Sequence, residues 1–473
     1  MTLPAWINDA VFYQIFPDRF ANGSPSNDPV NVKPWGSKPT HQGFQGGDLK
    51  GIRDHFDYLL DLGINAIYLN PIFQSPSTHR YDTVDYFRID PRVGDEQEFL
   101  DLLEFAHQKN VRIILDGVFN HSGRGFFAFS DILENGEQSP YKDWFHIKKY
   151  PINAYGHGDA TDYLGWWNNK SLPKFNTFNP ETRSYIMRVV RYWTERGIDG
   201  WRLDVPCEID DDSFWAEFTD TVKGINPQAY TVGEIWDVQP RWVGDHHFDG
   251  LMHYPLRSAL IEFLNQKIHT WEFGSKVEHL LNVYPAENLA GFLLLVGSHD
   301  TERIKTMFSG SVEKIKQAFL FTMTFPGVPS IFYGDEVGME GGKDPDCRRA
   351  FPWDENLWNS ELHEWVRQLI GIRKKEESLH SGTYMIIQTG HPESVFTAVR
   401  AARDDCILIA INPVSTTQDV AISLGELGWE TTSSVEKLIG DGEYKYEGSE
   451  LRLIIPAFRS VMFKTKGFRA QNG

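Results

Sequence analysis

Eight short apolar segments, each separated from the next by a longer stretch of chain, constrain the fold of this sequence more than any other feature. They lie at residues 11–16, 64–70, 111–119, 200–205, 230–236, 250–254, 291–298 and 330–334. Near-continuous apolar runs are typical of strands that are buried on both faces, as in parallel sheets. Eight such strands alternating with helices favour a closed (β/α)8 TIM barrel over an open sheet.

The stretches between these segments carry helix signals. Asn179 is a suitable N-cap, Pro180 fits the first helical position, and Gly197 can end the helix. Asp95 and Glu98 form a capping-box pair at the start of another helix. The apolar stripe of that helix comprises Phe99, Leu102, Leu103 and Ala106.

One spacing is too long for a simple barrel. About 80 residues separate the third and fourth strand candidates, where a helix and two loops need roughly 30. Residues 121–176 are rich in Gly, Asn, Asp, Trp and Tyr, and they show no helical period. We therefore predict a barrel (domain A, residues 1–120 and 177–380) with an inserted subdomain over its mouth (domain B, 121–176). Alternating segments after residue 380 predict a C-terminal antiparallel β-sandwich (domain C, 381–473).

The charge balance excludes some classes of partner. The chain has 46 Lys and Arg against 65 Asp and Glu, for a net charge of −19. Nucleic acids and anionic membranes both require a basic surface, so we expect neither as a partner. Aromatic residues make up 14% of the chain, which suits both a large core and a cleft lined with flat apolar rings for sugars.

Cysteine use and the N-terminal sequence predict a cytoplasmic protein. Cys207, Cys347 and Cys406 are far apart and odd in number, so they form no disulfide framework or metal-binding spacing. The first residues show no basic region followed by an apolar stretch, as a signal peptide would. Prolines interrupt the longest uncharged run, 318–334, which predicts a buried helix and strand and not a membrane span.

Polar side chains gather where the predicted strands end. They are Asp116, Asn120 and His121 after the third segment, Arg202 and Asp204 on the fourth, Glu234 on the fifth, and His299 and Asp300 on the seventh. Barrel active sites lie at this C-terminal rim. An isolated Arg-x-Asp is usually a structural ion pair. Three carboxylates at neighbouring rim positions, however, repel one another and suit a reacting centre that becomes positive, such as an oxocarbenium-like sugar.

Four ordered motifs then resemble a known family. They are DGVFNH (116–121), GWRLD (200–204), GEIW (233–236) and GSHD (297–300), and they are similar to the signature regions of the α-amylase superfamily, glycoside hydrolase family 13. Further matches at 45–49, 80–86 and 327–348 extend the resemblance over essentially the whole chain. LPKFN (172–176) and residues 341–348 resemble the neopullulanase, cyclomaltodextrinase and maltogenic amylase group. Within that group, the likeness is greatest to cyanobacterial debranching enzymes that lack the N-terminal domain.

The resemblance implies roles for residues of the rim. Asp204 matches the nucleophile, Glu234 the general acid and base, and Asp300 the third carboxylate, which holds hydroxyl groups of the distorted sugar. Arg202 would keep Asp204 ionised. The other residues matching substrate-binding positions are Tyr81, Asp116, His121, Trp236, His299, Asp344 and Arg348. Two roles are open for Asp116, direct contact with substrate or ordering of the rim through hydrogen bonds.

The resemblance also implies a structural calcium ion and no organic cofactor. Its oxygen ligands would come from Asn22, Asn27, Asp28, Asp48 and the carbonyl of Gly46. Ser24 stands in the same loop where the family often has Asp, which removes one negative charge. The alternative interpretation of this loop is an ordinary polar turn.

Together these features predict a retaining α-glucan hydrolase that acts on malto-oligosaccharides, cyclodextrins and α-1,6 maltooligosyl branches. Pro206 and Cys207 differ from the residues that the group usually has beside the leaving-group site, and we expect a cleft that no N-terminal domain narrows. The alternatives are a cyclomaltodextrinase or neopullulanase with mainly α-1,4 activity, and a transglycosylase on the same scaffold. A non-catalytic barrel of the transporter-accessory type is disfavoured because Asp204, Glu234 and Asp300 are all present. The sequence indicates no particular oligomeric state.

Overall fold

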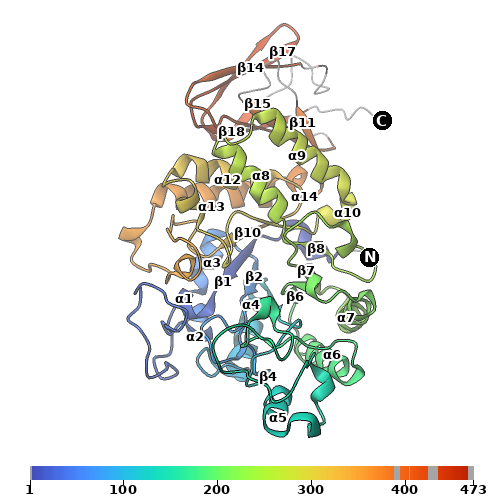
Figure 1. Ribbon diagram of the computed structural model, residues 1–473. Helices are drawn as coiled ribbons and strands as arrows, with labels where there is room; N and C mark the ends of the chain where they lie inside the picture. The colour runs from blue at the N-terminus through green and yellow to red at the C-terminus, as the bar shows by residue number, and fades with distance from the viewer. Residues whose placement is uncertain (1–2, 388–394, 404, 424, 426–434, 467–473) are drawn as a thin grey trace.

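The computed structural model describes residues 3–387, 395–403, 405–423, 425 and 435–466, and Figure 1 shows their arrangement. Its centre is a parallel sheet that follows the order of the sequence, β1-β2-β5-β6-β7-β8-β9-β10, with β10 beside β1. These strands are β1 (Phe12–Ile15), β2 (Ala66–Leu69), β5 (Arg112–Gly117), β6 (Gly200–Leu203), β7 (Tyr230–Gly233), β8 (Gly250–Leu251), β9 (Leu293–Leu295) and β10 (Val328–Phe332). A parallel bridge between Met252 and Leu293 links the end of β8 to β9 and nearly closes the barrel. The predicted (β/α)8 fold is thus confirmed.

Helices surround this barrel. They are α1 (Pro17–Phe20), α2 (Leu49–Asp54), α3 (Phe56–Leu62), α4 (Glu96–Gln108), α6 (Pro180–Glu195), α7 (Asp212–Ile225), α8 (Tyr254–Leu264), α9 (Thr270–Val283), α10 (Ala286–Leu289), α11 (Ile304–Met307), α12 (Val312–Thr324), α13 (Ser360–Lys375) and α14 (Glu377–Ser381). Short 3-10 turns complete the shell, at η1 (Ala5–Asp9), η5 (Pro206–Glu208), η6 (Pro240–Trp242), η7 (Asp346–Arg348) and η8 (Glu355–Leu357). The Asp95–Glu98 capping box opens α4, and the Asn179 side chain accepts hydrogen bonds from Glu181 and Thr182 at the start of α6.

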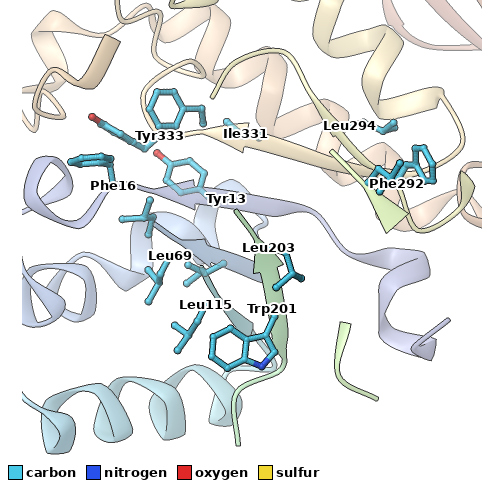
Figure 2. Close-up of a cluster of buried hydrophobic side chains, with 14 of the residues drawn as sticks. Tyr13, Phe16, Leu69, Leu115, Trp201, Leu203, Phe292, Leu294, Ile331 and Tyr333 are labelled. Carbon is cyan, nitrogen blue, oxygen red and sulfur yellow. The ribbon is translucent and has the colours of Figure 1, made fainter. Parts of the chain in front are cut away.

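The strands separate two buried layers because successive side chains point to opposite faces. Outward-facing residues such as Leu69, Leu115, Trp201 and Leu203 pack in the large cluster between barrel and helices (Figure 2). A smaller apolar cluster fills the barrel interior toward the N-terminal ends of the strands, where Trp6 of η1 packs against Phe12 and Tyr230. The alternation leaves Arg202 on the inner face of β6. Polar interior side chains therefore lie toward the C-terminal ends of the strands.

The long connection between β5 and β6 projects beyond the barrel, at the end of the molecule opposite the C-terminal sheets (Figure 1). It contains α5 (Phe127–Asn135) and three 3-10 turns, η2 (Gly136–Gln138), η3 (Lys142–Trp144) and η4 (Trp166–Asn168). The nine-residue helix α5 differs from the expectation of no helical period, because Ala128, Phe129 and Ile132 form a short buried face. A two-strand ladder of β3 (Phe73–Gln74) and β4 (Asp85–Ile89) lies in the preceding connection.

Antiparallel sheets form the C-terminal region, as predicted. A five-stranded sheet has the order β11-β12-β13-β18-β15, and a three-stranded sheet has the order β14-β17-β16. Their strands are β11 (Thr383–Ile387), β12 (Phe396–Ala402), β13 (Asp405–Ile411), β14 (Gln418–Ser423), β15 (Val435–Gly440), β16 (Glu443–Glu447), β17 (Glu450–Ile455) and β18 (Ser460–Lys466). The parts of the predicted domain C at 388–394, 404, 424, 426–434 and 467–473 lie outside the described residues. Within the described ranges, no helix has both the length and the apolar character that crossing a membrane requires.

Candidate active site

Arg202 is the centre of the polar cluster at the C-terminal rim. Its Nη1 donates to Asp116 Oδ1 at 2.7 Å and to Asp204 Oδ1 at 3.0 Å. Its Nη2 forms an ion pair with Glu234 Oε2 at 2.7 Å. One guanidinium thus joins carboxylates from β5, from the end of β6 and from the end of β7. These three strands are neighbours in the sheet, so the barrel itself brings the residues together.

Burial changes the protonation of these groups. Removal from water raises the pKa of Asp204 well above its usual value, and the positive charge of Arg202 opposes that rise. Burial likewise raises the pKa of Glu234, again against Arg202. Because the two carboxyl groups are close and share one cation, a proton bound by one disfavours a proton on the other. The pair can therefore hold one acid and one carboxylate at a pH where isolated carboxyls are both ionised.

The backbone after Asp204 is strained. Val205 has φ 35° and ψ 53°, a left-handed conformation that is unfavourable for a β-branched residue. In this conformation its N–H donates to Glu234 Oε2 at 3.1 Å. The indole of Trp236 donates to the other oxygen, Oε1, at 3.0 Å. The strained turn therefore helps to fix the carboxyl group of Glu234.

A second group of predicted residues surrounds Asp300. The Tyr81 hydroxyl lies 2.5 Å from His299 Nε2, and the two rings are nearly parallel at 5.3 Å. His299 Nε2 is also 3.0 Å from Asp300 Oδ2. Arg348 donates to Asp300 Oδ1 at 3.1 Å and pairs with Asp344 at 3.0 Å. Asp300 itself is the most accessible of the three predicted catalytic carboxylates, with its side chain 31% exposed.

Tyr81 connects the two groups, because its hydroxyl also donates to Asp116 Oδ2 at 2.8 Å. His121 lies behind Tyr81, with Nε2 3.1 Å from the Tyr81 carbonyl. Burial lowers the pKa of His121 to about 3, and it lowers the pKa of His299 well below its usual value. Both imidazoles are therefore neutral at ordinary pH. A neutral imidazole can donate one hydrogen bond and accept another, as sugar hydroxyls require.

Trp236 is the remaining predicted substrate-binding residue. It is 45% exposed, and its ring stacks on Tyr254 at 3.8 Å. All eleven residues predicted for catalysis and substrate binding therefore belong to one connected set at the rim: Tyr81, Asp116, His121, Arg202, Asp204, Glu234, Trp236, His299, Asp300, Asp344 and Arg348. Asp116 is only 1% exposed and is fully bonded to Arg202, Tyr68 and Tyr81, which favours the interpretation that it orders the rim.

The sequence analysis missed the polar residues at the ends of β1 and β2. Gln14 Nε2 donates to Asn70 Oδ1 at 3.0 Å and lies 2.9 Å from His299 Nδ1. Asn70 in turn donates to the Tyr81 hydroxyl at 3.1 Å. Tyr68 donates to Asp116 Oδ2 at 2.6 Å. A signal was present, because an amide within or directly after an apolar strand candidate has to find a partner when it is buried.

The loop predicted to bind calcium lies apart from the carboxylate cluster. Asn22 Nδ2 donates to both carboxylate oxygens of Asp28, at 3.0 and 3.1 Å. Gly46 has φ +86°, and a β-carbon there would lie 2.2 Å from Asp28 Oδ1, so another residue would be strained and would displace the Asp28 carboxylate. Asp48 accepts from the backbone N–H groups of 23, 24 and 51, and Ser24 Oγ contacts Ser26 Oγ. The structure thus brings Asn22, Asp28 and Gly46 together, but it gives Asp48 and Ser24 other partners.

Two buried oxygens of this loop have no partner in the structure, Asn22 Oδ1 and Asn27 Oδ1. Unpaired buried acceptors are costly, and oxygen atoms of this kind suit a hard cation. In the described part of the chain, no three His, Cys, Asp or Glu side chains are grouped as metal ligands. Any ion in this loop would therefore depend on amide and carbonyl oxygens together with Asp28.

The fold and the carboxylate cluster together define a glycoside hydrolase on a (β/α)8 barrel. Comparison with known proteins agrees. The family description "Alpha amylase, catalytic domain" matches residues 14–368, and this chain belongs to the α-amylase family. It is 42% identical over 470 residues to a cyclomaltodextrinase of Geobacillus thermopakistaniensis (strain MAS1), a match that covers 98% of this chain and 78% of that protein. Other relatives are named neopullulanase, maltogenic alpha-amylase and, in Bacillus subtilis, intracellular maltogenic amylase.

Two solved structures match nearly their whole length. The ligand-free cyclic α-maltosyl-(1→6)-maltose hydrolase of Arthrobacter globiformis superposes with a TM-score of 0.90 at 36% identity, covering 98% of this chain and 100% of that one. The debranching enzyme of Nostoc punctiforme superposes with a TM-score of 0.89 at 41% identity, covering 98% and 99%. The protein is therefore a glycoside hydrolase whose relatives are cyclomaltodextrinases, neopullulanases, maltogenic amylases and a debranching enzyme.

Proposed function

We propose that the protein cleaves α-glucans by double displacement, with Asp204 as nucleophile, Glu234 as general acid and base, and Asp300 as the third carboxylate. The observation that carries this proposal is the position of Arg202, which binds Asp204 and Glu234 through the two ends of one guanidinium. A nucleophile and an acid placed side by side are the arrangement that a retaining glycosidase needs.

The reaction then follows from the contacts. Glu234, in its protonated form, gives its proton to the glycosidic oxygen as the bond to the anomeric carbon breaks. Asp204, ionised beside Arg202, forms a bond to that carbon and gives a glycosyl-enzyme. Glu234, now a carboxylate, accepts a proton from water, whose oxygen displaces Asp204 and restores both groups.

The remaining rim residues are proposed to hold the sugar whose bond is cleaved. The Tyr81 ring offers a flat surface beside the carboxylates. Neutral His121 and His299 would bind hydroxyl groups of the sugar in exchange for their present contacts with the Tyr81 carbonyl and with Asp300. Asp300 is partly exposed and can accept from two hydroxyls, with Arg348 fixing its orientation. The Arg348–Asp344 pair forms the end wall of this part of the cleft.

We propose malto-oligosaccharides, cyclodextrins and α-1,6 maltooligosyl branches as substrates. The name cyclomaltodextrinase points to cyclic α-glucans, the name of the Arthrobacter hydrolase points to a (1→6) bond, and the name of the Nostoc debranching enzyme points to branches. Cys207 is exposed in the turn η5 that follows Asp204, and we propose that this turn borders the site of the leaving group. A thiol there gives a less polar wall than an amide, and this suits the extra rotatable bond of an α-1,6 linkage.

Branched cyclodextrins distinguish the candidate activities. Release of an intact linear branch, detected by chromatography of the products, is the result expected for debranching. Ring opening with the branch still attached would instead identify a cyclomaltodextrinase with mainly α-1,4 activity. Products longer than the substrate at high substrate concentration would identify a transglycosylase.

We further propose that the loop at 22–28 and 46–48 holds a structural calcium ion. Rotation of the Asn22 amide by 180° would turn its unpaired oxygen toward the Asp28 carboxylate, an arrangement that a cation between them stabilises. Asn27 Oδ1 and the Gly46 carbonyl supply further oxygens. Asp48, already bonded to three backbone N–H groups, would contribute only through its remaining lone pairs.

We propose a cytoplasmic location. All three cysteines are free, and Cys207 is exposed, which suits a reducing compartment. The name of the intracellular Bacillus subtilis relative is in agreement.

A further inference from the structure

An aromatic stack leads outward from the candidate active site. The ring of His121 stacks on Trp166 at 5.4 Å with an interplanar angle of 16°. Trp166 stacks on Trp167 at 4.6 Å with an angle of 12°. Three nearly parallel rings therefore extend from a histidine of the sugar site to the surface.

The outermost ring of this stack is unusually exposed. Trp167 is 81% exposed, more than any other Trp, Tyr or Phe side chain in the described part of the chain. One of its faces covers Trp166, so the other face meets solvent. Single exposed apolar residues are common, but this one is continuous with the catalytic cluster.

The backbone holds Trp167 in a costly conformation. Trp167 has φ 50° and ψ 35°, and Asn168 also has a positive φ of 58°, which bulky residues rarely adopt. Strain of this kind persists where surrounding contacts enforce it, often at ligand sites.

Those contacts are present. Trp166 N donates to Leu172 O and Asn169 N donates to Trp166 O, both at 2.9 Å. Gly165, which opens the turn, has its ideal β-carbon position 2.3 Å from Asn169 O, so only glycine allows this close approach. The turn is therefore a rigid support for the exposed ring.

The turn is also anchored to the site. Pro173 forms a bridge with Gly165, and its neighbour Lys174 forms a bridge with His121. Lys174 Nζ donates to the carbonyl of Glu208 at 2.6 Å, and Glu208 ends the turn η5 that follows Asp204. The ring of Trp167 is thereby held at a defined position relative to Asp204.

We infer that Trp167 is the stacking platform of an outer glucosyl-binding subsite, which holds a unit of a long α-glucan away from the bond that is cleaved. A pyranose ring has an apolar face that matches an exposed indole, and the next residue, Asn168, is exposed and carries an amide that can bond to hydroxyl groups. This inference rests on the proposed function and extends it to the length of substrate that the cleft prefers.

The test compares substrate lengths. For Trp167→Ala, kcat/KM on maltoheptaose should fall about three- to tenfold through a higher KM, as expected for loss of one stacking contact. Maltotriose is too short to reach the subsite, so the variant and the wild type should cleave it alike. Trp167→Phe should restore most of the lost preference for the longer chain. Trp271→Ala is the matched control, because Trp271 is also exposed but lies on α9, outside the rim.

Three results would overturn the inference. Equal losses on both chain lengths would indicate that Trp167 only supports His121. Unchanged kinetics on maltoheptaose would show that no glucosyl unit binds there. A change in oligomeric state of Trp167→Ala, measured by light scattering, would indicate a surface for a second copy. Failure of the wild-type protein to cleave either substrate would refute the proposed function itself.

Discussion

At the scale of single residues, one arginine organises the site. Arg202 is fully buried and contacts three carboxylates, an arrangement whose desolvation cost is offset only when every charge is paired. Replacing any partner changes the protonation of the others. The residues at this rim are therefore best tested by substitutions that keep volume and remove charge.

Asp204→Asn should lower kcat by at least about 10⁴-fold, because an amide cannot form the glycosyl-enzyme. Glu234→Gln should also be nearly inactive on α-glucans, but it should retain activity on substrates whose leaving group needs no proton. Proton NMR of the first product should show the same anomeric configuration as the substrate. The exposed Asp61→Asn on α3 is the matched control, with wild-type turnover expected. Inversion at the anomeric carbon would contradict the assignment of Asp204.

Glu336 makes stability depend on pH. It is fully buried between the hydroxyls of Tyr13 and Tyr58, and burial raises its pKa to about 7. The folded protein therefore binds a proton that the unfolded chain has released, and the folded state loses this advantage as pH rises from about 4.5 to 7. We expect the free energy of unfolding to fall by about 3 kcal/mol across this window.

Glu336→Gln should remove this contribution, because the amide stays neutral at every pH. Chemical denaturation at pH 5, 6, 7 and 8 gives the free energy of unfolding, which should change less with pH in the variant than in the wild type. Glu278→Gln, at an exposed glutamate of α9, serves as the control. Parallel profiles for Glu336→Gln and the wild type would show that Glu336 is already ionised at pH 5.

At the scale of elements, residues proposed for catalysis and for calcium binding lie at the ends of strands and helices. The turn after β6 holds Val205 in a left-handed conformation, and its N–H fixes Glu234. Asp48 is the N-cap of α2, and its carboxylate also accepts a hydrogen bond from the backbone N–H of Ser24 in the loop at 22–28. The loop and the helix are therefore one structural unit, and a ligand that binds the loop should stabilise the helix.

Chelation of calcium should lower the melting temperature if the loop at 22–28 and 46–48 binds the ion. A ligand that binds only the folded state stabilises it by about 2.7 kcal/mol at a hundredfold excess over Kd. Differential scanning calorimetry with EDTA, and then with added calcium, measures this effect. Asp28→Asn should abolish the response to calcium without removing the carboxylates of the rim. A melting temperature that responds to neither reagent would identify an ordinary polar loop.

At the scale of the whole molecule, the C-terminal sheets are joined to the barrel by buried polar contacts. Gln317 of α12 is fully buried, and its Nε2 donates to the carbonyls of Asn412 at 2.7 Å and Arg459 at 3.2 Å. Arg400 of β12 donates to the Thr324 carbonyl at the end of α12. Backbone carbonyls of each region are therefore hydrogen-bonded by a side chain of the other region.

Gln317→Leu keeps most of the side-chain volume but removes the donor. We expect the free energy of unfolding to fall by about 1–3 kcal/mol, because buried carbonyl groups lose their partner. Urea denaturation gives this value, with Gln368→Leu on the exposed face of α13 as the control. Equal stability of both variants would show that water replaces the lost bonds.

The sequence by itself determined the barrel, because its strands are buried on both faces and therefore read as apolar runs. All eight strand candidates contain the observed strands, or overlap them in the case of β10 at Val328–Phe332. The caps at Asp95 and Asn179 were also predictable, since their hydrogen bonds are local. Some site residues could be predicted because they lie at strand ends, which a parallel barrel brings to one rim: Asp116, His121, Arg202, Asp204, Glu234, His299 and Asp300. Tyr81, Asp344 and Arg348 lie in loops and turns, and only the family resemblance pointed to them.

Only the tertiary structure decided what depends on contacts between distant segments. The sequence shows that the buried amides of Gln14 and Asn70 need partners, but only the tertiary structure identifies these partners as His299 and Tyr81, which come from distant segments. Helix α5 was missed because its buried face is short. The exposed position of Trp167 depends on the turn between Gly165 and Leu172, which packs on His121 through Trp166. The burial of a strand can be predicted from the apolar character of consecutive residues, whereas the shape of the cleft depends on loops that meet only after folding.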